Sequence, residues 1–254
     1  MAAFVGATWA TRGWFTTASD TADRWVCDVY PSVWSLWRAH QDATRILLNI
    51  PIGLPEPTGS RRACDEHAKR LLGERHPGVF YAPVRPAVYQ HSILRAKEIN
   101  EEAGFSIQNQ AWSLVSRIRE VDEFLDDRPG ARDRCRETHA EVCYHALNAG
   151  PLRYSPTTAA GRGERMDIVR AASHDIDTSL DRAIETFTHP RYAPMVTSPM
   201  DIVDAFVAAI TARREERLAT LPVAPPTDAR GLPMEIVYPA DLKQLTLTAI
   251  EASE

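Results

Sequence analysis

The segment Ile46-Leu-Leu-Asn-Ile-Pro-Ile-Gly-Leu-Pro55 decides the fold class of this chain. Its apolar start is typical of a buried strand, and the prolines and glycine that follow favour a turn. Asn49 therefore lies at the end of the predicted strand, where open sheets commonly carry their active sites. An asparagine offers a metal ion only a neutral carbonyl oxygen, whereas a divalent cation prefers charged carboxylate ligands.

Further strands and helices are expected on both sides of this segment. Apolar runs predict strands at residues 3–7, 13–17, 24–29, 45–50, 134–139 and 234–238. Helical spacing predicts helices at residues 32–39, 63–72, 87–103, 109–125, 164–172 and 200–218. This order favours one α/β domain over residues 1–254, built on a mixed sheet with helices on both sides. Residues 219–233 are rich in proline and are predicted to link it to a C-terminal strand and tail.

Composition and charge argue against several classes of protein. The 254 residues carry a formal charge of −5, which is unlike the basic footprint of a dedicated nucleic-acid binder. The sequence contains no apolar run of the roughly 18–20 residues that cross a bilayer, and no secretion signal, so we expect a soluble, cytoplasmic protein without membrane partners. The four cysteines lack the paired spacing of a structural zinc site.

Several motifs together resemble one family. They are Arg61-Arg-Ala-Cys-Asp65, Val79-Phe-Tyr-Ala-Pro-Val-Arg85, Glu137-Thr-His-Ala-Glu-Val-Cys143 and Asp228-Ala-Arg-Gly-Leu-Pro-Met-Glu-Ile-Val-Tyr-Pro239. In this order they resemble the predicted RNase-H-like nuclease family, domain-of-unknown-function family 429, and most closely its salt-loving archaeal branch. The resemblance implies an RNase-H-like fold and a nuclease that hydrolyses nucleic acid with Mg²⁺ or Mn²⁺ held by acidic residues.

Two positions depart from what this resemblance implies. The family's first strand usually ends in a catalytic aspartate, but the matching residue here is Thr8, and the second expected carboxylate is Asn49. Neither side chain carries the charge that balances a divalent ion. We therefore expect a degenerate site with reduced or lost activity.

Other acidic residues supply candidate ligands. Asp201 and Asp204 lie three residues apart and share one face of a predicted helix, which resembles the last acidic helix of RNase-H-like nucleases. The alternative is that Ser198 or Asp201 caps this helix and the acids complement its dipole. Glu137, His139 and Glu141 occupy alternate positions, so an extended strand would place them on one face, although a helix starting after Glu137 would not.

The resemblance assigns roles to these acids. We predict Glu137, Asp201 and Asp204 as metal ligands and catalytic residues, with Glu120 or His139 assisting proton transfer. Glu120 also lies beside Arg117 in the helical projection, and a solvated ion pair is the other interpretation. We assign no role to Asp122.

Substrate binding is predicted for a few basic and aromatic side chains. Arg61, Arg62 and Arg85 are candidates because guanidinium groups bind phosphates bidentately, and Trp9 adjoins Thr8 at the strand end. A solvated charged face and a packed core are the alternative explanations.

Two functions follow. The first is metal-dependent phosphodiester hydrolysis. The second is a catalytically inactive pseudoenzyme whose cleft binds nucleic acid, a nucleotide or a protein partner.

Overall fold

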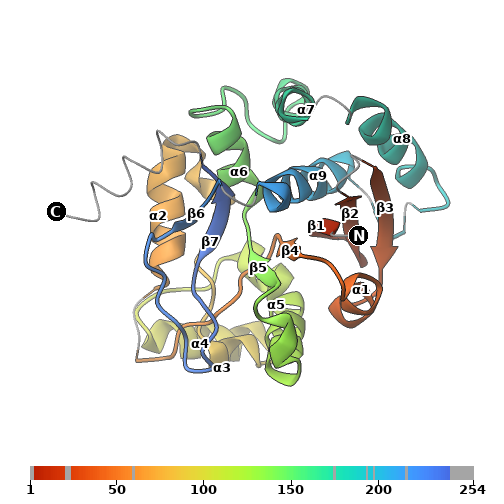
Figure 1. Cartoon of the computed structure of the whole chain (residues 1–254). Helices are drawn as coiled ribbons and strands as arrows, with labels where there is room; N and C mark the ends of the chain where they lie inside the picture. Colours follow the sequence, from red (N-terminus) through yellow and green to blue (C-terminus); the bar gives the residue numbers. More distant parts are fainter. Residues whose placement is uncertain are drawn as a thin grey trace.

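A five-stranded mixed sheet forms the centre of the protein. The computed structural model describes residues 3–20, 24–58, 61–173, 176–192, 194–196, 198–214 and 217–240. The strands of the sheet are β1 (Ala3–Ala10), β2 (Gly13–Asp20), β3 (Trp25–Tyr30), β4 (Arg45–Leu48) and β5 (Cys135–Glu137). Their order is β3-β2-β1-β4-β5; β1 to β3 form an antiparallel meander, whereas β4 and β5 join parallel to β1 (Figure 1). The predicted α/β class is confirmed, in an RNase-H-like arrangement.

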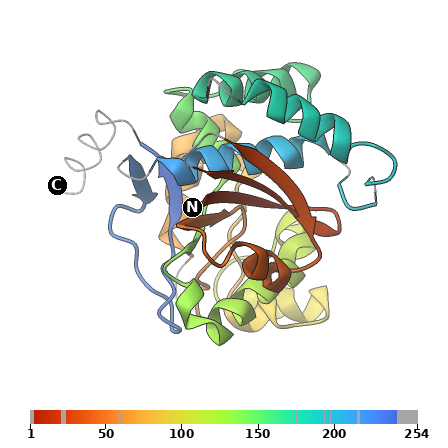
Figure 2. The ribbon, with the colours of Figure 1, turned by 45° about the vertical axis from the view of Figure 1, so that its right-hand side comes forward.

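Helices cover both faces of this sheet. They are α1 (Val33–His40), α2 (Ala63–Leu72), α3 (Arg85–Val88), α4 (Ile93–Glu102), α5 (Asn109–Asp127), α6 (Ala140–Leu147), α7 (Ala159–Ala172), α8 (Asp177–Phe187) and α9 (Pro199–Arg213). Helix α9 crosses one face and is itself covered by α7 and α8, while α1 and α5 lie on the opposite face (Figures 1 and 2). The core is therefore divided into two apolar layers by the sheet.

Helix α9 packs directly on the backbone of β1. Ten of its residues from Ile202 to Ala212 are buried, so it is apolar on nearly every side, as expected for a helix between two layers. A Cβ atom at Gly6 would lie 2.2 Å from both the Ala205 carbonyl oxygen and the Ala209 amide nitrogen. Ser198 caps the helix by accepting a hydrogen bond from the Met200 amide, as one of the two interpretations predicted.

Three expected elements were wrong in part. The helix at 87–103 is divided into α3 and α4, because Ser92 takes an extended conformation and starts a new helix. The helix at 200–218 ends at Arg213, and the last residue joins strand β6 (Leu218–Leu221), which pairs with β7 (Ile236–Pro239). The strand at 134–139 ends at Glu137, and α6 begins at Ala140. Helix α6 agrees with the alternative of a helix starting after Glu137, whereas α8 was not anticipated.

The proline-rich segment connects β6 to β7 and is attached to the domain through Asp228. The Asp228 carboxylate accepts the Leu54 amide at 3.0 Å and pairs with the buried Arg85 guanidinium. Arg85 also pairs with Asp122, which is only 4 % exposed. The predicted C-terminal tail beyond Ala240 lies outside the described residues.

The described helices include none that has both the length and the apolar character needed to cross a membrane.

Replacing Gly6 by alanine should separate α9 from the sheet. The added methyl group meets backbone atoms that cannot rotate away, so we expect a loss of about 3 kcal/mol in the free energy of unfolding. Urea denaturation measures it. Gly163→Ala in α7 is the matched control, because its Cβ meets nothing within 4 Å and alanine should stabilise the helix by up to about 1 kcal/mol. Equal stability of the two variants would contradict this packing.

Candidate functional site

A cavity of about 260 Å³ lies where β4 and β5 end. Its walls come from the chain after both strands, the first residues of α2, the segment 78–80, and helices α5, α6 and α9. Five of the predicted site residues line it: Asn49, Arg62, Glu137, His139 and Asp204. The structure thus brings together residues that lie as much as 155 positions apart in the chain (204 minus 49).

Arg62 occupies the floor of this cavity as a buried cation. Its Nη1 and Nη2 atoms donate to the two carboxylate oxygens of Glu137 at 2.7 and 2.9 Å. Its Nε and Nη2 atoms donate to Asp65 at 3.2 and 2.5 Å, and Nη1 also reaches the Ile52 carbonyl at 2.9 Å. Arg62, Asp65 and Glu137 are 2 %, 1 % and 3 % exposed. The hydrogen-bond donors of the Arg62 guanidinium are therefore all engaged by partners inside the protein.

This arrangement changes the role of Glu137. One of its oxygens also accepts the Ile52 amide at 2.6 Å, so both oxygens are engaged by protein donors. Burial raises the pKa of Glu137, and the paired Arg62 guanidinium opposes this rise. The sequence analysis did not assign a role to Asp65. The spacing Arg62-x-x-Asp65 at the start of a helix is the signal that could have indicated this ion pair.

Asp204 is the acidic residue of the cavity with a free oxygen. Its Oδ1 accepts a hydrogen bond from the Tyr144 hydroxyl at 2.8 Å. Its Oδ2 has no partner among the described residues. The pKa of Asp204 is raised to about 8, chiefly by burial; the hydrogen bond from Tyr144 and the Arg165 charge oppose this rise, whereas the charges of Glu141 and Asp201 add to it. Asp201 does not line the cavity, and burial raises its pKa to about 6.

Thr8 and Asn49 lie on the sheet face that α9 covers. The backbone N–H of Asn49 donates to the Ala7 carbonyl at 2.8 Å, so Asn49, just after β4, lies beside Thr8 on β1. Side chains alternate along a strand, and Gly6 faces α9, so Thr8 does too. The Thr8 hydroxyl is buried and has no partner in the described part of the chain. Thr8 does not line the cavity itself.

Glu137, His139 and Glu141 do not share a strand face, so that expectation was wrong. His139 is the residue before α6, its Nε2 lies 3.3 Å from the Gly78 carbonyl, and burial lowers its pKa. Glu141 lies in the first turn of α6 and forms a bidentate pair with the buried Arg165 at 2.7 and 2.6 Å. The helix begins here because Ala140, Cys143 and Tyr144 are buried at the i, i+3, i+4 spacing of a helix rather than at alternate positions.

The other predicted residues lie outside the cavity. Glu120 accepts the Val33 amide at 2.6 Å and pairs with Arg117 at 2.6 Å, so it holds the start of α1. Arg117 in turn stacks on Trp9, with 4.4 Å between the guanidinium carbon and the ring centroid. Arg61 covers the Tyr81 ring at 4.4 Å. Arg85, in the Asp122 and Asp228 network, is also engaged within the protein.

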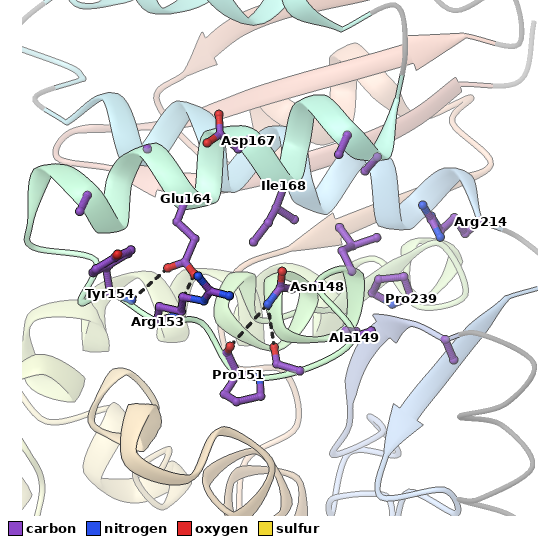
Figure 3. A pocket seen from close by; sticks show the side chains of 18 residues that line it. Asn148, Ala149, Pro151, Arg153, Tyr154, Glu164, Asp167, Ile168, Arg214 and Pro239 are labelled. Atoms are coloured by element: carbon purple, nitrogen blue, oxygen red, sulfur yellow. Dashed lines mark hydrogen bonds between the residues drawn. The ribbon is translucent and has the colours of Figure 1, made fainter.

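A larger hollow of about 950 Å³ lies on another part of the surface (Figure 3). It is lined by the end of α6, one side of α7 and the end of β7. Glu164 spans its edge by accepting the amides of Arg153 and Tyr154. None of the predicted site residues lines this hollow, so the smaller cavity is the better candidate site.

A comparison with protein families fits this picture. The model of the family described as "Protein of unknown function (DUF429)" matches residues 9–227. The chain belongs to the DUF429 family. No curated protein and no solved structure gives a significant match. The DUF429 match covers all five predicted residues that line the cavity.

The cavity residues do not fit a divalent metal ion. Glu137 is bound by a guanidinium, and Thr8 and Asn49 are neutral, so Asp204 is left without a second free carboxylate among the described cavity residues. The part of the chain that the structure describes contains no group of three His, Cys, Asp or Glu side chains arranged to hold a metal ion.

Removing Arg62 should cost much of the stability. Arg62→Ala leaves the Asp65 and Glu137 carboxylates buried without their cation, and such a break costs about 3–5 kcal/mol. Urea denaturation at pH 7 measures the change. The control is Arg95→Ala, which breaks the exposed Arg95–Glu98 pair and should leave the denaturation midpoint unchanged. A similar midpoint for both variants would show that the ion pair has no structural role.

The raised pKa of Asp204 predicts a pH dependence of stability. The Asp204 carboxyl group holds its proton up to about pH 8 in the folded protein but releases it near pH 3.8 in the unfolded chain. Its contribution to the free energy of unfolding is therefore complete at low pH and is lost as the pH rises from 3.8 to 8. We expect the free energy of unfolding of Asp204→Asn to fall by about 1–2 kcal/mol less than that of the wild type over this pH range. Thermal denaturation of both proteins from pH 5 to 9 tests it, and parallel profiles would contradict it.

Proposed function

We propose that this DUF429 protein is a catalytically inactive pseudoenzyme, which binds a ligand in the cavity at the ends of β4 and β5. The observation that carries this proposal is the saturation of Glu137 by Arg62 and the Ile52 amide. A carboxylate with both oxygens engaged by protein donors is poorly placed to take up a cation as well.

The neutral residues support the same proposal. Phosphodiester hydrolysis with Mg²⁺ or Mn²⁺ relies on carboxylates that neutralise the ion and orient a water molecule. Thr8 and Asn49 stand where the RNase-H-like resemblance implies two such carboxylates. The cavity itself is retained, which suits binding of nucleic acid, a nucleotide or a protein partner. The cytoplasmic location and the archaeal branch stay predictions from sequence.

Metal-dependent nuclease activity is the second candidate. The free Oδ2 of Asp204 favours it, because this oxygen belongs to the last acidic helix and faces the cavity. A single free carboxylate balances only half of the charge of a divalent ion, so we rank this function second.

A cleavage assay separates the two candidates. Labelled single-stranded and double-stranded DNA and RNA are incubated with the protein and with Mg²⁺ or Mn²⁺, and Asp204→Ala serves as the control for contaminating nuclease. We expect no cleavage above that of the control. Metal-dependent cleavage that disappears in Asp204→Ala would overturn the pseudoenzyme proposal.

Restoring the two carboxylates should restore metal binding. Thr8→Asp with Asn49→Asp places two charged ligands on the sheet face below α9, where Asp204 is the third. We expect calorimetry to detect Mn²⁺ binding at least about tenfold tighter than in the wild type, equivalent to about 1.4 kcal/mol. Adding Asp204→Asn to the double variant should remove the gain. An unchanged affinity would mean that these three positions do not share a site.

A further inference from the structure

Asn49 and Asp204 each present a polar side-chain atom without a partner among the described residues of the candidate cavity, as do His139 at Nδ1 and the Gln110 side chain. The Asn49 side-chain oxygen accepts the Ala140 amide at 3.3 Å, which leaves its Nδ2 as a donor. Asp204 uses Oδ1 for Tyr144, which leaves Oδ2. Neither the Asn49 nor the Asp204 atom is among the buried, unpartnered atoms of the described residues, so each keeps some exposed surface, and both residues line the cavity. The site thus offers at least one amide donor and one carboxyl oxygen to a ligand.

The charges around the cavity oppose a phosphate group. Its described lining residues include four with carboxyl side chains, Asp65, Glu137, Glu141 and Asp204, and one arginine. That arginine, Arg62, already binds two of the four. Among the lining residues that the structure describes, no guanidinium or ammonium group is therefore left to meet a phosphate, which needs such donors.

The remaining walls are apolar and the volume is small. Ile50, Val79, Phe80, Leu114 and Ile236 contribute aliphatic and aromatic surface. At about 260 Å³ the cavity lies just below the range of roughly 300–1,000 Å³ that holds drug-sized ligands. A flat ring system with one hydrogen-bonding edge suits such a site, because its faces meet apolar walls while its edge meets the two polar atoms.

We propose that the cavity binds an uncharged heterocycle with an amide-type edge, that is, a nucleobase or a nucleoside without phosphate. The Asn49 Nδ2 donates to a ring carbonyl oxygen, and the Asp204 carboxyl group forms a second hydrogen bond, through Oδ2, with the neighbouring ring nitrogen. This inference rests on the pseudoenzyme proposal and names the ligand of the same site. The selectivity comes from the lack of a free guanidinium or ammonium group among the described lining residues, since a phosphate would lose its hydration there without gaining a cationic partner.

Calorimetry on the full chain tests the ligand class. The probes are uridine, cytidine, adenosine and guanosine, each compared with its 5′-monophosphate. We expect at least one nucleoside to bind and its monophosphate to bind at least about tenfold more weakly. A monophosphate that binds as tightly as its nucleoside, or the absence of binding by all four nucleosides at millimolar concentration, would overturn the proposal.

Variants test the two contacts. Asn49→Ala and Asp204→Ala should each weaken nucleoside binding at least about fivefold, whereas Asp204→Asn keeps a neutral side chain that can donate and accept a hydrogen bond and should retain it. Asp167→Asn, in the larger hollow, is the control for nonspecific effects. Spermidine serves as a cationic probe: if it binds and Asp204→Asn abolishes this binding, the site takes an organic cation and the proposal is wrong.

Failure of the nucleoside proposal can be distinguished from failure of the pseudoenzyme proposal. Metal-dependent cleavage of nucleic acid by the wild type would overturn the pseudoenzyme proposal whatever the nucleosides do. Tight monophosphate binding without cleavage would instead overturn only the proposed ligand class. Circular dichroism of each variant confirms that the protein is folded before binding is measured.

Discussion

The buried guanidinium of Arg62 is the interaction on which the candidate site depends. It joins the start of α2, the end of β5 and the turn after β4 through hydrogen bonds to Asp65, Glu137 and the Ile52 carbonyl. A buried arginine is tolerated only when its lost hydration is replaced by charged partners, and here two carboxylates supply them. The ends of three elements are therefore held in one position, and the cavity between them is preformed.

The same interaction decides the chemistry that the site can perform. An acidic cavity at the end of parallel strands suits a metal ion, yet Arg62, the one arginine among its described lining residues, is already bound to two of its acids. Glu137 is thus a structural residue in this protein, and Asp204 is left with one free oxygen. The neutral side chains of Thr8 and Asn49 and the walled cavity beside Asn49 support the proposed binding without hydrolysis.

Two further constraints keep this cavity in place. Helix α9 approaches β1 so closely that only glycine fits at position 6, which sets the height of Asp204 above the sheet. On the other side, Asp228 binds the Leu54 amide and Arg85, so the segment between β6 and β7 holds the turn after β4. Both are contacts between segments far apart in the chain. The site is consequently a product of the whole domain rather than of one motif.

The sequence by itself determined the α/β class, the strands of the sheet, and helix α2 at residues 63–72, because apolar periodicity and turn residues act locally. It also indicated which acids to examine. Only the tertiary structure decided what they do: Arg62 meets Glu137 across 75 residues, and Glu120 meets the start of α1 across 87. His139 and Glu141 were misplaced because the burial of Tyr144 and its neighbours favours a helix over a strand. A partner so distant leaves no periodic trace in the sequence, so pairing, burial and the resulting pKa of Asp204 follow only from the fold.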